Sequence, residues 1–300
     1  MKLTFPDRLT AACRARGNAV CVGLDPRWEQ LPLELRRRHS AGTLDAMAGA
    51  FAEFCLRVLD IVAPLVPVVK PQSAFFEACG PAGMSALQTV LRRARTLDLL
   101  TILDSKRNDI ASTAQAYADA VFGKQAVWPA DAMTINPYLG RDAVEPFLAS
   151  ARQAQGGVFV LVRTSNKGAS QFQNLDCAAK PLYEHVAEAV GAWAGENIGS
   201  GGLGDVGAVV GATHPAELAR VRELLPHVIF LIPGYGVQGG SARDTAAGFR
   251  PDGTGAIVNS SRGITASFAP EEKNWEASVE AATRNTIAAL TTQTPMGNLV

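Results

Sequence analysis

The sequence predicts a (β/α)₈ barrel, or TIM barrel, in which eight parallel strands, each followed by a helix, close into a cylinder. Three observations support this fold class. Eight short apolar runs alternate with longer segments of helical periodicity along the 300 residues. The runs are continuously apolar, as expected for parallel strands buried on both faces. No change in composition marks a domain boundary, so we expect one domain over residues 1–300. A doubly wound open sheet is the alternative, because periodicity does not distinguish a closed sheet from an open one.

The expected strands follow one another along the whole chain. In order they are AVCVGL (19–24), LVPVVK (65–70), LLTILD (99–104), DAMTIN (131–136), GVFVLV (157–162), VGAVVGA (206–212), VIFLIP (228–233) and GAIVNS (255–260). Each is short enough for a barrel strand and apolar nearly throughout. The polar stretch 163–177 and the Gly-rich stretch 195–204 lie between units and are expected to be loop insertions.

The expected helices fill the intervals between these strands. Segment 44–62 places its apolar residues broadly on one side, which indicates a helix packed on the sheet. Segment 109–122 begins at Asp109, whose carboxylate suits the cap of a first turn. Segment 214–225 has Pro215 just inside its start, a favoured place for proline. Further helices are expected at 83–95, near 141–153, near 178–193 and at 271–290.

Composition excludes several classes of protein. Lys plus Arg and Asp plus Glu both number 28, so the formal net charge is zero and neither a nucleic-acid partner nor a polybasic membrane face is expected. The start MKLTFPDRLT has no signal-peptide core, and no apolar stretch approaches the ~20 residues of a membrane span. The five cysteines form no C-x-x-C pair and the four histidines form no ligand cluster. We therefore expect a cytoplasmic protein without disulfides or a bound metal.

Polar side chains gather where the expected strands end. In a barrel, functional groups come from the C-terminal ends of the strands and the loops that follow them. One charge after a strand is unremarkable because loops are polar, but the set indicates a site. Its members are Asp25, Lys70, Asp104, Lys106, Thr164, Ser165, Asn166 and Arg262.

The segment LLTILDSKRNDIAST (99–113) concentrates charge at the end of a buried strand. Asp104 and Lys106 are two residues apart, so their side chains point the same way if extended geometry continues. A lysine flanked by carboxylates stays charged and suits a fixed proton donor. Asp109 is alternatively only a helix cap, with Thr113 on the same helical face. The whole group is alternatively a solvated ion-pair cluster of little energetic consequence.

Two glycine patterns bear on phosphate binding. The first, within 199–204, follows a helix and precedes a strand, which is the wrong order for a dinucleotide site, so we expect a loop. The second, within 234–239, follows the seventh strand and neighbours Arg262 after the eighth. Barrels commonly bind phosphate there, and glycine amides with an arginine fork suit it. Tight turns beside an exposed arginine are the alternative. No P-loop pattern occurs, so ATP and Mg²⁺ are not implied.

These motifs resemble one family. LDSKRNDIAST is similar to the D-x-K-x-x-D-I-x-x-T signature of the orotidine 5′-phosphate decarboxylase family. The pieces VCVGLDPR, VVKPQSAFFE, TINPYLG, VLVRTSNKGA, IPGYGVQGG and IVNSSRGI resemble its longer bacterial branch, type 2. The resemblance touches nearly every strand end from 20 to 264. The D-x-K-x-x-D core alone is shared with metal-using barrel enzymes such as hexulose-phosphate synthase-like proteins.

The resemblance implies a cofactor-free decarboxylation of orotidine 5′-monophosphate (OMP) to UMP in pyrimidine biosynthesis. Lys106 is then the proton donor to C6 of the pyrimidine, and Asp104 lies beside the substrate carboxylate. Lys70 and Asp25 bind the ribose hydroxyls, and Lys70 also holds the charge network together.

The resemblance also implies a homodimer with shared active sites. Asp109 and Thr113 then reach into the site of the partner subunit. The loop 234–240 closes over the ligand. The substrate-binding residues that the resemblance adds are Ser165 on the pyrimidine edge, Gln238 and Arg262 on the phosphate, Gly263 through its backbone, and Pro233.

Two other functions fit the same residues. One is a metal-dependent sugar-phosphate lyase or isomerase on the same scaffold, although Lys70 stands where a metal site would want an acid. A chelator would separate it from a metal-free enzyme. The other is a non-catalytic binder of a phosphorylated ligand, against which the Asp–Lys–Asp set argues.

Overall fold

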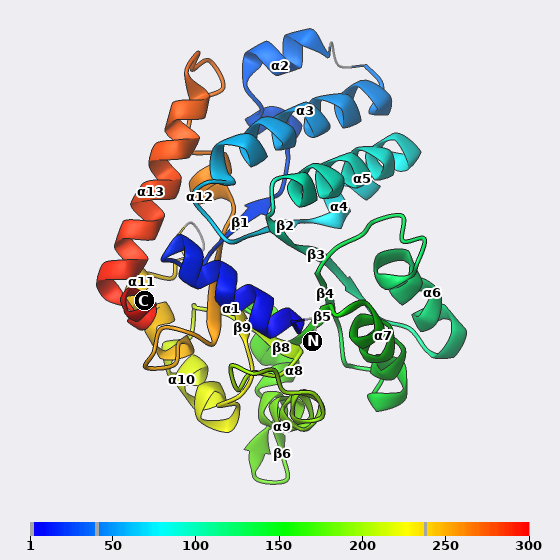
Figure 1. Cartoon of the computed structure of the whole chain (residues 1–300), viewed down its shortest axis with the longest axis vertical. Helices are drawn as coiled ribbons and strands as arrows, with labels where there is room; N and C mark the ends of the chain where they lie inside the picture. The colour runs from blue at the N-terminus through cyan, green and yellow to red at the C-terminus, as the bar shows by residue number, and fades with distance from the viewer. Residues whose placement is uncertain (1–2, 40–41, 237–238, 300) are drawn as a thin grey trace.

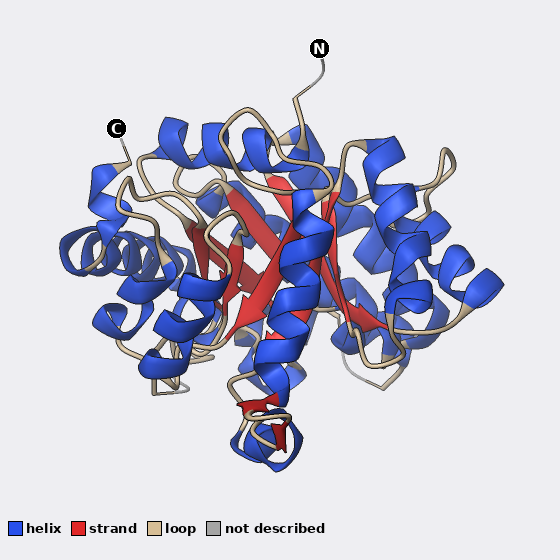
Figure 2. Cartoon of the chain, turned by 90° about the horizontal axis from the view of Figure 1, so that it is seen from below, coloured by secondary structure: helices blue, strands red, loops and turns tan. Residues whose placement is uncertain are grey.

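A closed barrel of eight parallel strands forms the centre of the molecule (Figures 1 and 2). The computed structural model describes residues 3–39, 42–236 and 239–299. Around the barrel the strand order is β1-β10-β9-β8-β5-β4-β3-β2. Closure confirms the barrel prediction, and the open doubly wound alternative is wrong. The barrel strands are β1 Val20–Leu24, β2 Val68–Pro71, β3 Leu100–Arg107, β4 Ala132–Ile135, β5 Gly157–Arg163, β8 Val206–Val210, β9 Phe230–Ile232 and β10 Ala256–Ser260.

Helices surround the strands on the outside (Figure 2). Most barrel strands are buried along their whole length, as the continuous apolar runs predict. The helices are α1 Phe5–Arg16, α2 Leu33–Arg38, α3 Leu44–Val62, α4 Ser73–Glu77, α5 Gly80–Thr96, α6 Ala111–Phe122, α7 Arg141–Ala154, α8 Ser170–Gln173, α9 Leu182–Gly195, α10 Pro215–Leu224, α11 Ala242–Thr245, α12 Arg262–Thr265 and α13 Trp275–Gln293. In the part of the chain described, no helix is both long and apolar enough to cross a bilayer.

Helix α3 shows how local sequence sets an element. Thr43 caps it by accepting a hydrogen bond from the Ala46 amide, so the helix begins at Leu44. Its predicted range, 44–62, is confirmed. The side chains of Phe51, Phe54 and others on that face are buried.

Helix α6 begins two residues later than predicted. It starts at Ala111, and no side chain caps it. Ala111 has a positive φ of 46°, so the chain turns sharply before the helix. Asp109 lies outside the helix, where its Oδ1 accepts a hydrogen bond from the Ile110 amide at 2.8 Å. The prediction that Asp109 caps the helix, and shares a helical face with Thr113, is therefore wrong.

Segment 163–177 is more structured than a plain loop. It contains α8 and leads into a two-stranded antiparallel hairpin, β6 Asp176–Cys177 and β7 Lys180–Pro181, which projects at one end in Figure 2. Because the hairpin occupies 176–181, α9 begins at Leu182 and the predicted start near 178 is wrong. Helix α13 likewise begins at Trp275, not at 271.

Both ends of the chain close the N-terminal end of the barrel. Phe5 of α1 packs edge-on against Phe159 of β5, with ring centroids 6.0 Å apart. Arg8 of the same helix binds Asp131, just before β4, at 2.6 Å. At the other end of the sequence, Leu299 lies against the segment that leads into β10. Helix α1 was not predicted from the sequence.

Candidate active site

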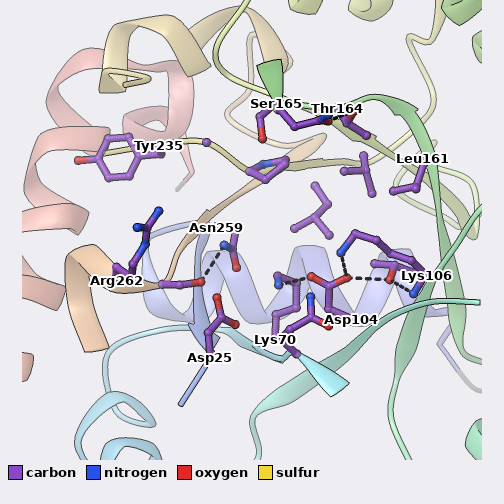
Figure 3. A pocket seen from close by; sticks show the side chains of 18 of the residues that line it. Asp25, Lys70, Asp104, Lys106, Leu161, Thr164, Ser165, Tyr235, Asn259 and Arg262 are labelled. Atoms are coloured by element: carbon purple, nitrogen blue, oxygen red, sulfur yellow. Dashed lines mark hydrogen bonds and ion pairs between the residues drawn. The ribbon is translucent and has the colours of Figure 1, made fainter. Parts of the chain in front are cut away.

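A cavity of about 510 Å³ opens at the C-terminal ends of the strands. This is the end at which barrel enzymes place their sites, and the volume suits a ligand of nucleotide size. Figure 3 shows Lys106 on one side of the cavity and Arg262 with Tyr235 on the other. The residues that line it are Asp25, Arg27, Lys70, Gln72, Asp104, Lys106, Thr134, Leu161, Thr164, Ser165, Asn166, Gln173, Val209, Leu231, Pro233, Gly234, Tyr235, Asn259, Ser261, Arg262 and Gly263.

Asp104 of β3 holds two ammonium groups at the floor of the cavity. Its Oδ2 accepts a hydrogen bond from Lys70 Nζ of β2 at 2.5 Å, and its Oδ1 accepts one from Lys106 Nζ at 2.6 Å. Lys70 and Asp104 are only 5% and 6% exposed, whereas Lys106 is exposed toward the cavity. The three groups therefore form one buried ion network with a single reachable ammonium, not a solvated surface cluster.

Electrostatics fixes the charge of the two buried members. Burial alone would raise the pKa of Asp104, but the charges of Lys70 and Lys106 outweigh burial and hold this pKa well below its usual range. Burial would lower the pKa of Lys70, but Asp104 and Asp25 outweigh it and raise this pKa above its ordinary value. Both groups are therefore ionised across the neutral range.

A distortion of β3 presents Lys106 to the cavity. Leu103 pairs with Met133 of β4, but the next pair is Arg107 with Ile135, so β3 carries two more residues than its neighbour. Lys106 within this bulge has a φ of 47°, a conformation that side-chain-bearing residues seldom adopt. The simple extended geometry assumed from the sequence is therefore wrong at this point, although Asp104 and Lys106 do lie together.

Two acceptor oxygens face the cavity without a partner. Within the described residues, Asp25 Oδ1 at the end of β1 and Asn259 Oδ1 in β10 are buried and make no hydrogen bond. A buried oxygen of this kind is stabilised when a ligand supplies a donor, such as a hydroxyl. Asp25 was predicted from the sequence as a site residue. Asn259 was missed, because one asparagine near the end of a strand gives no distinguishing pattern in the sequence.

The side of the cavity beneath Arg262 is built from glycine turns. Gly234 follows β9 with a φ of 94°, which favours glycine, and leads to Tyr235. Gly23 of β1 lies against the other loop: a Cβ there would come within 1.9 Å of Ser261 Oγ. Arg262 and Gly263 line the cavity as predicted. Gln238 lies outside the described residues.

The segment after β5 forms the wall opposite Lys70 and Asp25 (Figure 3). Ser165 sits close over Gly211, where a Cβ would meet Ser165 Cβ at 2.8 Å. Beneath it, Arg163 is buried and pairs with Glu217 of α10 at 2.6 Å. Arg163 also donates to the Thr164 carbonyl and to the Gln173 side chain. This pair fastens the segment to the barrel.

Most predicted site residues come together, and two do not. The cavity gathers Asp25, Lys70, Asp104, Lys106, Ser165, Pro233, Arg262 and Gly263. Asp109 and Thr113 do not line it in a single chain, and Thr113 is exposed. In the described part of the chain, no group of three or more His, Cys, Asp or Glu side chains is placed to hold a metal ion. The metal-dependent alternative therefore finds no ligand set there.

Fold and site together define the class: a (β/α)₈-barrel enzyme with a lysine–aspartate network at its strand ends. Comparison with known proteins gives the family. The chain matches the model of the Orotidine 5′-phosphate decarboxylase / HUMPS family over residues 18–277 and belongs to this family. The resemblance seen in the motifs is thereby confirmed.

Individual relatives agree with the family assignment. The chain is 48% identical over 292 residues to an orotidine 5′-phosphate decarboxylase of Rhodopirellula baltica, covering 94% of this chain and 97% of the relative. Among solved structures it resembles Leishmania donovani OMP decarboxylase, with a TM-score of 0.76, 36% identity and coverage of 97% and 98% of the two chains. It also resembles L. donovani UMP synthase, with a TM-score of 0.78 and 38% identity, and there it spans only 57% of the longer chain.

Proposed function

We infer that the protein is a carboxy-lyase that converts OMP to UMP, the step that completes UMP in pyrimidine biosynthesis. One observation carries the inference: a single reachable ammonium, Lys106, is held by a buried aspartate in a cavity whose far side presents Arg262 (Figure 3). A phosphorylated ligand fixed at Arg262 would extend across the cavity toward Lys106. Family membership and the named relatives support the same reaction.

The reaction needs a positive charge at C6. When the bond from C6 to the carboxylate breaks, CO₂ leaves and the electron pair stays on C6, which has no adjacent carbonyl to accept it. The Lys106 ammonium stabilises this pair electrostatically and then transfers a proton from Nζ to C6. Lys106 is left as a neutral amine and regains a proton from water. No electron acceptor or metal takes part in this sequence.

Asp104 and its neighbours prepare the site for that step. The ionised Asp104 lies beside the substrate carboxylate in this assignment and favours its departure by repulsion. Lys70 keeps Asp104 charged. Asp25 Oδ1 accepts from a ribose hydroxyl, and Asn259 Oδ1, unpartnered beside it, provides a second acceptor. Binding energy from the phosphate, remote from C6, orders the site.

We propose that two copies of the chain share their active sites. Asp109 and Thr113 lie outside the cavity of their own chain, on the loop after β3 and the start of α6. The same loop, helix α6 and the loop after β4 carry exposed large apolar side chains: Ile110 is 55% exposed, Tyr117 38% and Tyr138 85%. A main-chain hydrogen bond of 2.9 Å from the Asn136 amide, just after β4, to the Arg107 carbonyl at the end of β3 holds together the starting points of the two loops that carry Ile110 and Tyr138. Exposed apolar groups of this kind favour a symmetric interface, which would bring Asp109 to the partner's site.

The decisive experiment follows the loss of OMP absorbance by the purified protein, with and without EDTA. We expect conversion to UMP at an undiminished rate in the presence of the chelator. Absence of conversion would contradict the proposed function. Conversion that stops with EDTA and returns with a divalent metal would contradict the metal-free mechanism.

A further inference from the structure

Thr134, in the middle of β4, is more than a core residue. It is 1% exposed, lines the cavity and lies directly opposite the bulge in β3. Its hydroxyl uses its full hydrogen-bonding capacity, one donor and two acceptor positions. Oγ1 accepts from the Ser105 amide at 3.0 Å and from the Lys106 amide at 2.9 Å, and it donates to Asp104 Oδ1 at 2.9 Å.

These bonds compensate for the lost strand pairing. Between Leu103 and Arg107, β3 has two residues more than β4, so amides within the bulge face no carbonyl of the neighbouring ladder. Amides removed from the ladder need other partners, and the side chain of Thr134 supplies one for the Ser105 and Lys106 amides. Hydrogen bonds to this one hydroxyl thus help to stabilise the bulge, and with it the unusual φ of 47° at Lys106.

The same hydroxyl also fixes the other end of the Lys106 side chain. Asp104 Oδ1 accepts from Thr134 Oγ1 and from Lys106 Nζ. Thr134 therefore binds the main chain of Lys106 on one side and orients the carboxylate oxygen that holds its ammonium on the other. The Lys106 amide thus binds Thr134 Oγ1 directly and its ammonium is linked to the same atom through Asp104 Oδ1, which restricts the movement of Nζ relative to the cavity.

We propose that Thr134 is a positioning residue, which sets the place of the Lys106 ammonium through its Oγ1 and so governs the proton transfer without exchanging a proton itself. This inference rests on the proposed decarboxylation. Serine in place of threonine would keep all three hydrogen bonds, whereas valine would keep the shape and lose them. An ammonium displaced by as little as 1 Å costs turnover more than binding.

The test compares Thr134→Val and Thr134→Ser with the unaltered enzyme. For Thr134→Val we expect kcat to fall by about 10- to 100-fold, with KM for OMP and the affinity for UMP each changed by less than about threefold. For Thr134→Ser we expect kcat to return to within about threefold of the unaltered enzyme. Thr134→Ala replaces Thr134→Val in the comparison if the valine variant does not fold, as judged by circular dichroism.

Thr101→Val is the matched control. Thr101 is equally buried, on β3 near the closed end of the barrel, and its hydroxyl bonds Asp131. We expect this variant to lose thermal stability and keep its kcat. An unchanged kcat in folded Thr134→Val would overturn the proposal, as would a Thr134→Ser variant impaired as much as Thr134→Val, because the methyl group would then be what matters. If the unaltered enzyme does not decarboxylate OMP, the proposed function itself fails, which is a separate outcome.

Discussion

Asp104 divides its two oxygens between a buried lysine and a reachable one. Oδ2 binds Lys70, and Oδ1 binds Lys106 together with Thr134. Ion networks of this kind are costly to bury unless every charge has a partner. The desolvation cost is offset here because the two buried charges, Lys70 and Asp104, bind each other directly. Lys106 remains partly solvated at the cavity. Asp104 thus contributes both to the stability of the fold, through Lys70, and to the proposed reaction, through Lys106.

Replacing Lys106 tests the proton donor directly. We expect Lys106→Ala to lower kcat by at least about 10³-fold, since both the electrostatic stabilisation of C6 and the proton are lost. Binding of UMP should persist because the proposed phosphate and ribose contacts do not involve Lys106. Turnover with OMP and UMP binding by calorimetry measure the two effects. Lys124→Ala, which removes an exposed lysine after α6, is the control. Appreciable turnover by Lys106→Ala would rule out this role.

Acid titration tests the Asp104 network. Because the folded-state pKa of Asp104 lies below its unfolded-state value of about 3.9, its contribution to stability is complete above that value and is lost as pH falls toward the folded-state pKa. Asp104→Asn should therefore be less stable than the unaltered protein at pH 6, and the difference should narrow at pH 3. Denaturant titrations at the two pH values measure it. A difference independent of pH would contradict this assignment.

Some of these residues were accessible from the sequence and others were not. Asp104, Lys70 and Asp25 were predicted because charges directly after apolar strands stand out. Thr134 and Asn259 were missed because each lies inside its strand, where a polar residue looks like any hydrogen-bonded core residue. The role of Thr134 depends on a bulge in the neighbouring strand, and such a register shift leaves no trace in either segment alone.

At the scale of elements, the segment after β5 depends on a buried arginine. Arg163 is held by Glu217 of α10 and in turn supports the Thr164 carbonyl and Gln173. This pair joins the end of a barrel strand to an outer helix. It explains how a long insertion keeps Ser165 at a defined place above the cavity.

Removing Glu217 should loosen this wall. We expect Glu217→Ala to cost about 2–4 kcal/mol of unfolding free energy, because a buried guanidinium loses its partner. KM for OMP should rise more than kcat falls, since the residues affected line the cavity and are expected to contact the substrate without reacting. Denaturant unfolding and steady-state kinetics measure both. Glu223→Ala on the same helix removes an exposed ion pair with Arg220. It should change neither the unfolding free energy nor the KM by much.

Element types were predicted better than element boundaries. All eight barrel strands and helix α3 follow the apolar pattern, because burial on the sheet dictates it. The hairpin at 176–181 was missed because strands of two residues show no period. The start of α6 was misplaced because aspartate is a common helix cap. The turn at Ala111 instead leaves Asp109 outside the helix, bonded to the Ile110 amide.

At the scale of the whole molecule, mixed dimers test the proposed shared site. Lys106→Ala and Asp109→Asn should each be nearly inactive alone. If each site combines Lys106 of one chain with Asp109 of the other, random reassociation should restore about a quarter of the normal activity, because half of the dimers contain one intact site of two. Steady-state turnover after mixing and reassociation measures the recovery.

A second mixture provides the control. Asp104 and Lys106 belong to the same chain's network, so mixing Asp104→Asn with Lys106→Ala creates no intact site and should restore nothing. Equal recovery in both mixtures, or none in the first, would contradict the shared arrangement.

Both ends of the chain lie at the N-terminal end of the barrel, and this affects how the protein can be fused to others. Helix α1 and the residues around Leu299 lie at the end of the strands opposite the cavity. A fused partner, an affinity tag or a surface tether attached at either end would thus lie on the side opposite the cavity and would not block ligand entry. In L. donovani UMP synthase, a barrel of this shape is one part of a longer polypeptide.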